Sequence, residues 1–223
     1  MRLALLSDIH ANLPALEAVV KSLAAQRCDS VIVAGDSVGY YFWPKEVLSL
    51  LNEISAVSVA GNHEVMLTNS RADSNSLEEN VARYGSGLLR CLTDLSSSQL
   101  DQIDALPHTR IREKMNGKVL ICHGSPTNVD EYIYPDTSLT HLRPYVADDV
   151  RWVVMGHTHY PMDRSEGGVT FINPGSVGQP RNGKPGAHWA TLDTETGKID
   201  FFTELYDTTM VVNLARKLHP ELP

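Results

Sequence analysis

Cysteine is scarce in this sequence: the 223 residues include three, Cys28, Cys91 and Cys122, and none of them forms a CxxC pair. An odd number of widely spaced cysteines argues against a disulfide framework and against a thiolate zinc site. We therefore expect reduced thiols, most of them buried.

Long apolar runs and excess positive charge are lacking too. The N-terminal apolar run, residues 2–7, is too short for the core of a signal peptide, and no other stretch could span a bilayer, which predicts a cytoplasmic protein without membrane contact. The 19 Lys and Arg residues against 27 Asp and Glu residues give a net charge of -8. Nonspecific nucleic-acid binding needs clustered Lys and Arg and is not expected. An acidic chain can still bind an anionic substrate where bound cations reverse the local field.

What the sequence does contain is typical of a globular protein. Hydrophobic residues make up 42% of the chain and charged residues 21%, which is enough apolar surface for a sizeable core. No internal repeat, low-complexity tract or linker is visible. The length is within the range of one layered α/β domain, so we predict a single domain over residues 1–223.

Five short apolar segments have the pattern of buried strands. They are continuous rather than alternating, as expected for strands covered on both faces. They span residues 2–7, 31–34, 56–60, 119–122 and 152–155, and each is followed by Gly or by a residue that can bind a metal. Because ligands of layered α/β proteins bind beyond the carboxyl ends of the strands, we expect these five ends to meet at one site.

The remaining segments complete the expected architecture. Residues 14–26 have helical spacing of apolar residues, and Asn12 is expected to cap that helix. Residues 64–105 are predicted to form a helical outer layer or lid, with Ser96 as a helix cap. Further elements are expected at 188–193 and 198–205, as antiparallel strands, and at 207–218, as a closing helix.

The candidate chemistry lies in five histidines that follow the predicted strands, out of nine in the chain. Each alone would be interpreted as an ordinary loop histidine. Together with neighbouring Asp and Asn residues they form an ordered set: Asp8-x-His10, Gly35-Asp36, Gly61-Asn62-His63-Glu64, His123-Gly124 and Gly156-His157-x-His159. Carboxylate, imidazole and amide ligands suit Mn, Fe, Zn or Mg better than copper or iron–sulfur chemistry.

The five blocks, in this order, resemble the calcineurin-like metallophosphoesterase superfamily. The later block Asn173-Pro174-Gly175-Ser176-Val177-Gly178-Gln179-Pro180-Arg181 resembles its small bacterial and archaeal phosphodiesterase branch. The resemblance implies an α/β fold of two packed mixed β-sheets flanked by helices, a four-layer αββα sandwich. It also implies two divalent metal ions per chain, with Mn favoured and Fe, Zn, Ni, Co or Mg as alternatives.

The resemblance further divides the ligands between the two metals. It implies that Asp8, His10 and His159 bind one metal, that Asn62, His123 and His157 bind the other, and that Asp36 bridges them. Metals in such pairs lie roughly 3.5–4 Å apart and activate water for in-line attack on a phosphate ester. We therefore predict hydrolysis of a small phosphodiester by a metal-bridging water or hydroxide.

His63 is outside this ligand set, and its ordinary pKa of about 6.5 suits it to donate a hydrogen bond or a proton to the leaving group. Its alternative role is to brace the Asn62 loop. Arg181 is a candidate phosphate-binding cation. Glu64 could orient a ligand or simply open the following helix in solvent.

Two other segments each allow two interpretations. Residues 173–178 could direct backbone N–H groups at the site or form a tight strand exit. The aromatic cluster Tyr41-Phe42-Trp43 could stack on a substrate, although tertiary packing is favoured.

Several functions remain compatible with this pattern. Protein Ser/Thr phosphatases of the superfamily carry an Arg shortly after the Gly-Asp block, whereas this chain has Ser37-Val38-Gly39, which makes that activity less favoured. A phosphomonoesterase and a dinucleoside polyphosphate hydrolase would share the metal core. A noncatalytic interaction module, like the retromer subunit of this fold, or a purely structural metal site are the remaining alternatives. Because His63 and every ligand position are filled, catalysis is favoured.

Overall fold

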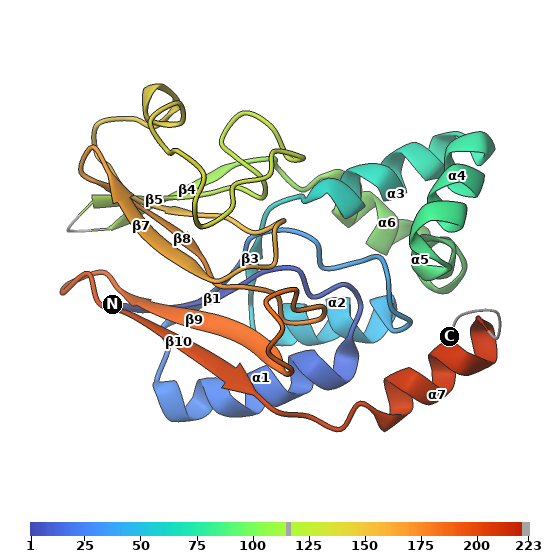
Figure 1. Ribbon diagram of the computed structural model, residues 1–223. Helices are drawn as coiled ribbons and strands as arrows, with labels where there is room; N and C mark the ends of the chain where they lie inside the picture. The colour runs from blue at the N-terminus through green and yellow to red at the C-terminus, as the bar shows by residue number, and fades with distance from the viewer. Residues whose placement is uncertain (115–116, 220–223) are drawn as a thin grey trace.

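The computed structural model describes residues 1–114 and 117–219, and the other residues of the predicted 1–223 domain, 115–116 and 220–223, lie outside this part. At its centre, two five-stranded sheets pack against each other (Figure 1). The strand orders are β10-β9-β1-β2-β3 and β4-β5-β6-β8-β7. The strands are β1 (Arg2–Leu6), β2 (Ser30–Val33), β3 (Val57–Ser58), β4 (Arg110–Lys114), β5 (Gly117–Ile121), β6 (Val150–Val154), β7 (Met162–Glu166), β8 (Val169–Asn173), β9 (Ala187–Asp193) and β10 (Ile199–Glu204).

Both sheets are mixed. β1, β2 and β3 are parallel, and so are β5, β6 and β8. β9 and β10 extend the first sheet by antiparallel pairing, and β4 and β7 flank the second in the same way. The predicted fold class of two packed mixed sheets flanked by helices is confirmed, as is the antiparallel pairing expected near the C-terminus.

The parallel strands are buried on both faces, which explains why their sequences are continuously apolar. Leu3, Leu5 and Ile32 face the second sheet and pack with residues such as Ile121 and Trp152. The alternate residues of the first sheet point to the other side, where they meet a separate apolar cluster. A strand covered in this way needs no polar positions between its ends.

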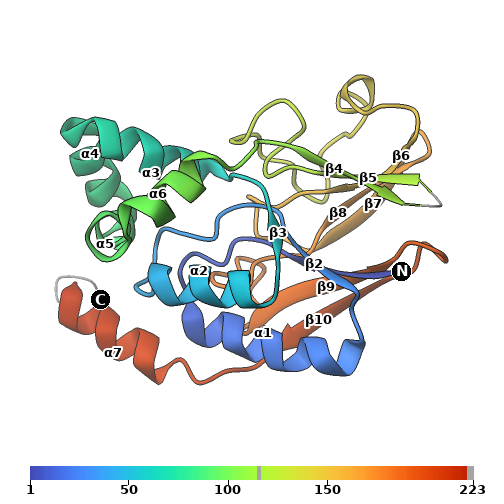
Figure 2. The same ribbon diagram turned by 180° about the vertical axis from the view of Figure 1, so that it is seen from behind.

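Helices α1 (Leu13–Gln26) and α2 (Pro44–Glu53) cover the outer face of the first sheet, as Figure 2 shows from behind. The α1 helix was predicted, and the Asn12 side chain caps it by accepting a hydrogen bond from the N–H of Ala15 at 3.3 Å. The α2 helix was not predicted. The outer face of the second sheet is covered by residues 133–146, which include the short 3-10 helix η1 (Arg143–Tyr145).

A helical region lies at one end of the sheets (Figure 1). It consists of α3 (Asn62–Ala72), α4 (Ser74–Tyr84), α5 (Gly87–Asp94) and α6 (Ser97–Asp104), which agrees with the helical character predicted for 64–105. Leu67, Leu88 and Ile103 form a small core of their own there. Ser96 caps α6 as expected. The closing helix α7 (Thr209–Leu218) ends near this region, where His219 Nε2 is 2.8 Å from Ser86 Oγ.

Three strands were not predicted from the sequence: β4, β7 and β8. β8 lies inside the second sheet, between β6 and β7, whereas β4 and β7 are its two edges. They read Arg-Ile-Arg-Glu-Lys and Met-Asp-Arg-Ser-Glu, and charged residues are usual on edge strands because they discourage pairing with other chains. The strand expected at 56–60 is limited to Val57–Ser58.

The three cysteines are unpaired; Cys91 and Cys122 are buried and Cys28 is partly exposed. Within residues 1–114 and 117–219, no helix has the length and apolar character needed to cross a bilayer.

Candidate active site

All seven predicted ligands lie together at the carboxyl ends of parallel strands, in the loops between the two sheets. We call these side chains the ligand cluster, and none of them is more than 7% exposed. Its members are Asp8 and His10 after β1, Asp36 after β2, Asn62 after β3, His123 after β5, and His157 and His159 after β6. The convergence follows from strand direction, since parallel strands of packed sheets end at a common edge.

The backbone of the ligand cluster is unusual. Five of its members adopt positive φ angles that are rare for residues other than glycine: Asp8 (53°), His10 (53°), Asp36 (53°), His157 (68°) and His159 (63°). Such conformations cost on the order of 1–3 kcal/mol each and persist where the surrounding structure enforces them. The loops are therefore shaped to direct side chains inward at a cost in backbone energy.

One half of the cluster contains Asp8, His10 and His159. The Nε2 atoms of His10 and His159 are 3.9 and 3.2 Å from Asp8 Oδ1. His10 Nδ1 donates to the Val38 carbonyl, and His159 Nδ1 donates to the Gln179 carbonyl. Because each Nδ1 carries the proton, both Nε2 atoms present lone pairs, and these two atoms face each other at 3.2 Å. Two lone pairs at this distance repel unless a cation or proton lies between them.

The other half contains Asn62, His123 and His157. Asn62 Oδ1 is 3.0 Å from both His123 Nε2 and His157 Nδ1. His123 Nδ1 donates to the Ala34 carbonyl at 2.7 Å, so in neutral His123 the Nε2 atom carries a lone pair directed at the Asn62 oxygen. A carbonyl that fixes the tautomer of a histidine in this way is a common partner of metal-binding imidazoles.

Asp36 lies between the two halves. Its Oδ1 accepts a hydrogen bond from the backbone N–H of His63 at 2.8 Å. Its Oδ2 is 3.7 Å from His10 Nε2 and 3.3 Å from His123 Nε2. One carboxylate oxygen thus faces a histidine of each half, which is the position that a bridging ligand requires. The donor atoms present fit divalent cations of the Mn, Fe and Zn type.

The charges in the cluster compensate one another. Burial acts to raise the pKa of Asp8, but His159 and His123 outweigh it and lower the pKa to about 2. Burial acts to lower the pKa of His123, but Asp36 and Asp8 outweigh it and raise the pKa to about 10. The carboxylates therefore require a nearby positive charge, which divalent cations would supply in place of the His123 proton.

His63 lies beside the cluster rather than within either half. Its ring packs near His10, Tyr40 and Tyr84, with centroid distances of 4.8, 4.7 and 5.4 Å. Burial lowers its pKa from the usual value. Its Nδ1 is buried and has no hydrogen-bond partner within residues 1–114 and 117–219. That nitrogen faces the backbone of Gly39, where an added Cβ would lie 2.1 Å away, whereas the ring lines the cavity and can contact a bound ligand.

Glu64 is buried and organises the backbone, which decides between its two interpretations. Its carboxylate accepts four backbone hydrogen bonds, at 2.7–3.3 Å, from Asp36, Ser37, Val38 and Gly61. Burial and the charge of Asp36 raise the pKa of Glu64 to about 7, whereas the backbone donors act in the opposite direction. Glu64 does open α3, where it accepts from the N–H of the N-cap residue Gly61, but the solvated part of that interpretation is wrong because Glu64 is buried. It joins the loop after β2 to the loop after β3.

Two glycines allow the loops to approach so closely. A Cβ at Gly61 would lie 2.2 Å from Asp36 Oδ1, and a Cβ at Gly156 would lie 1.9 Å from Ser7 Oγ. Neither position can carry a side chain without displacing the loop that holds a ligand.

Residues 173–178 support the site from outside it. The N–H groups of Val177 and Gly178 donate to the Ser7 and Asp8 carbonyls, at 3.1 and 2.9 Å, and are not directed at the cavity. The Asn173 side chain donates to the Gly156 carbonyl at 2.7 Å. This block is a strand exit that supports the ends of β1 and β6.

The ligand cluster opens into a cavity of about 320 Å³. Four members of the ligand cluster line this cavity, together with His63 and Met66. The lining also contains six side chains that we call the cavity wall: Tyr40, Arg83, Tyr84, Asp130, Tyr132 and Arg181. Only Arg181 was predicted; its Nη2 is 3.1 Å from Tyr40 Oη and 3.2 Å from Gln179 Oε1.

The aromatic cluster at 41–43 packs against the protein, as favoured from the sequence. Phe42 is 4% exposed and lies between the rings of Tyr41 and Trp43, at 6.1 and 5.8 Å. None of the three lines the cavity; the neighbouring Tyr40 does. The wall tyrosines carry no distinguishing sequence motif, and proximity of Tyr40 to the Gly-Asp block is the one available signal.

Fold and site together define a class: two-sheet hydrolases whose strand ends carry a His, Asp and Asn metal-ligand set. The chain belongs to the calcineurin-like phosphoesterase superfamily, whose domain model matches residues 1–197. It is therefore a phosphoric ester hydrolase of a family that uses divalent metals.

Related proteins match this chain over nearly its full length. Protein MJ0912 of Methanocaldococcus jannaschii is 31% identical, over 92% of this chain and 88% of its own. Phosphodiesterase YfcE of Escherichia coli is 25% identical, over 96% of this chain and 98% of its own. The crystal structure of a metallophosphoesterase from Sphaerobacter thermophilus, 30% identical, superposes with a TM-score of 0.80, covering 100% of this chain and 95% of that one.

Proposed function

We propose that the protein hydrolyses a small phosphodiester at a pair of divalent metal ions, with Mn²⁺ as the favoured metal. The observation that carries the proposal is the arrangement of acceptors: with neutral histidines, atoms with lone pairs face each other at 3.0–3.2 Å in each half of the ligand cluster. Two cations resolve this repulsion. The relative YfcE, named a phosphodiesterase, supports the choice of a diester.

In this proposal, Asp8, His10 and His159 would hold one ion, Asn62, His123 and His157 would hold the other, and Asp36, which faces both halves, would be shared by the two. Bound metals of this kind lower the pKa of water and neutralise the charge that develops on the phosphoryl oxygens. The fixed histidine tautomers keep the ligands in place without reorganisation during the reaction.

His63 acts on the substrate. It lines the cavity next to Asp36 and Asn62, where an imidazole N–H can donate a hydrogen bond or a proton to the leaving oxygen. The backbone N–H of His63 meanwhile orients Asp36, so the residue couples substrate binding to the bridging carboxylate. Arg181, 3.1 Å from Tyr40 Oη, contributes positive charge at the opening.

The test compares two chromogenic substrates with metal-stripped protein. Bis-p-nitrophenyl phosphate and p-nitrophenyl phosphate release the same leaving group, so their ratio reports diester against monoester preference. Mn, Ni, Co, Zn and Mg are added back in turn, and metal analysis gives the stoichiometry. We expect two ions per chain and faster release from the diester. Preference for the monoester would replace the proposal by a phosphomonoesterase.

A further inference from the structure

Two neighbouring tyrosines are not used by the proposed mechanism: Tyr132 of the cavity wall and Tyr134, which lies just outside the cavity lining. Their rings are nearly parallel, with a centroid distance of 5.9 Å and an interplanar angle of 20°. Both are solvent-exposed, 51% for Tyr132 and 39% for Tyr134. Exposed aromatic side chains forgo the free energy of burial, so their placement beside an active site calls for an explanation.

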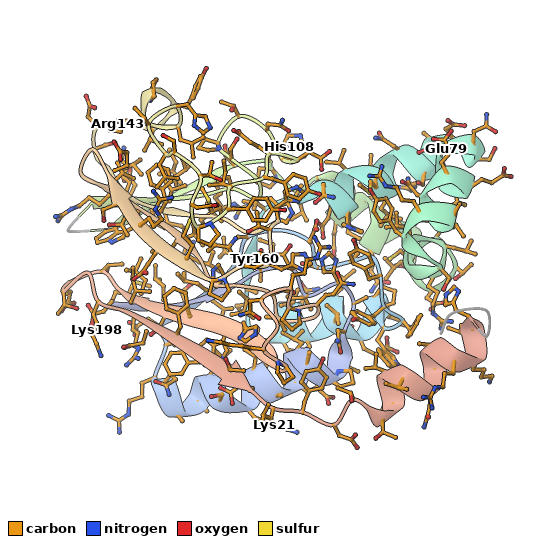
Figure 3. The ribbon with its side chains drawn as sticks, viewed as in Figure 1. Lys21, Glu79, His108, Arg143, Tyr160 and Lys198 are labelled. Atoms are coloured by element: carbon orange, nitrogen blue, oxygen red, sulfur yellow. The ribbon has the colours of Figure 1, made fainter. Side chains whose placement is uncertain are left out.

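The pair begins directly at the ligand cluster. The Tyr132 ring lies 4.2 Å from the His157 ring, centroid to centroid, and Tyr132 lines the cavity. Tyr134 continues the row outward, and Tyr160 meets it edge-on at 5.7 Å. Tyr160 is labelled near the centre of the molecule in Figure 3. A continuous aromatic surface thus leads from His157 to the outside.

The row is held rigidly by its surroundings. Ile133, between the two tyrosines, is 2% exposed and belongs to the core under the second sheet, so the exposed rings alternate with a buried anchor. Arg164 on β7 donates to the carbonyls of Pro135 and Thr137, at 2.8 and 2.6 Å. The backbone that carries the two rings therefore has little conformational entropy to lose when a ligand stacks there.

The two sides of the cavity differ in charge. Arg181 and Arg83 lie with Tyr40 and Tyr84 on the side of His63, and Arg83 covers the Tyr84 ring at 5.1 Å. Asp130 accompanies Tyr132 on the side of His157. A second phosphate would be repelled by Asp130, whereas the amino groups of a nucleobase could donate hydrogen bonds to its carboxylate.

From these contacts we propose that Tyr132 and Tyr134 form a stacking platform for a planar aromatic group of the substrate, with a nucleobase as the best match. The inference rests on the proposed function, because it places the phosphate at the ligand cluster and the base on the platform. The substrate class is accordingly a phosphodiester that contains a nucleoside.

The experiment measures binding rather than turnover. Isothermal titration calorimetry with Mn²⁺-loaded protein compares AMP with ribose 5-phosphate, which have the same phosphate and sugar and differ by the base. Stacking of one base is worth a factor on the order of 10 in Kd. We expect AMP to bind about tenfold more tightly, the Tyr132→Leu/Tyr134→Leu variant to lose most of this preference, and its Kd for ribose 5-phosphate to change less than about twofold.

The matched control is Tyr145→Leu, since Tyr145 is 62% exposed and does not line the cavity. The single variant Tyr132→Leu provides a second test if the double variant does not fold. Equal Kd values for the two ligands in the unmodified protein, or a preference that survives both substitutions, would overturn the platform. Hydrolysis of bis-p-nitrophenyl phosphate by the same preparation tests the proposed function separately, so the two can fail independently.

Discussion

The ligand cluster and the cavity wall are built in opposite ways, although they border the same cavity. The ligand cluster is buried and stands on strained loops at strand ends, and backbone carbonyls accept from Nδ1 of three of its four histidines, His10, His123 and His159. The cavity wall comes from a loop, a helix and irregular segments, and includes exposed side chains such as Arg181 and Tyr132. From this comparison we infer a division of roles: the ligand cluster, placed by the fold, carries the chemistry, and the cavity wall selects the substrate.

This division predicts that changes in the ligand cluster remove activity toward every substrate, whereas changes in the wall alter the relation between substrates. The two kinds of effect are separable by measuring metal content, kcat and KM together. The following substitutions test this division, in order from the largest expected effect to the smallest.

Asp36→Ala should have the largest effect. It removes the carboxylate that faces both halves of the ligand cluster, so we expect loss of bound metal and a fall in kcat/KM of about 10³-fold or more, since the metal pair contributes several kcal/mol to transition-state stabilisation. Metal analysis and kinetics with bis-p-nitrophenyl phosphate measure both. Asp163→Ala on β7 is the control, because Asp163 is exposed. Full metal content in Asp36→Ala would exclude the bridging role.

His63→Asn should reduce turnover without removing the metals. Loss of a positioned proton or hydrogen-bond donor costs about 10²–10⁴-fold in kcat. His63 also lies within 4.8 Å of ligand atoms of His10 and Asp36, so a ligand role is the competing possibility. Metal content distinguishes them, with exposed His108→Asn as control. If His63→Asn loses metal as Asp36→Ala does, the distinction between ligands and His63 is wrong.

Glu64→Gln should weaken both the fold and the site by an intermediate amount. The amide leaves one of the two oxygens that now accept four N–H groups, so buried donors lose their partner. We expect a loss of about 1–3 kcal/mol in the free energy of unfolding and about 10- to 100-fold in metal affinity. Urea unfolding and metal titration test this, against Glu79→Gln on the exposed face of α4. Unchanged metal affinity would make Glu64 a purely structural residue.

The sequence predicted the ligand cluster because each of its members carries a local signature. Asp8, His123 and the others follow predicted strands, so residue type and strand direction together indicate where they meet. Glu64 was ambiguous because an acid that opens a helix is common in solvent, and only the tertiary structure shows that the loop after β2 covers it.

The cavity wall could not be predicted in the same way. Tyr84 ends a helix and Tyr132 lies in an irregular segment, and their approach to His63 and His157 depends on how distant segments pack. The polar edge strands β4 and β7 were not predicted for a related reason. Charged residues protect these edges from pairing with other chains, so the alternation of apolar and polar residues along each strand is weak. Tertiary packing, rather than local pattern, decides these features.

Arg181→Met should have the smallest effect and the one most specific to the wall. Arg181 is exposed and interacts with Tyr40 and Gln179, so solvent screens its charge and its contribution to substrate binding is modest. We expect KM for bis-p-nitrophenyl phosphate to rise about fivefold with kcat and metal content nearly unchanged. Lys184→Met removes the same charge from the same loop without altering the cavity lining and serves as control. A fall in kcat with unchanged KM would instead place Arg181 with the chemistry of the ligand cluster, and the wall would then contribute more than substrate selection.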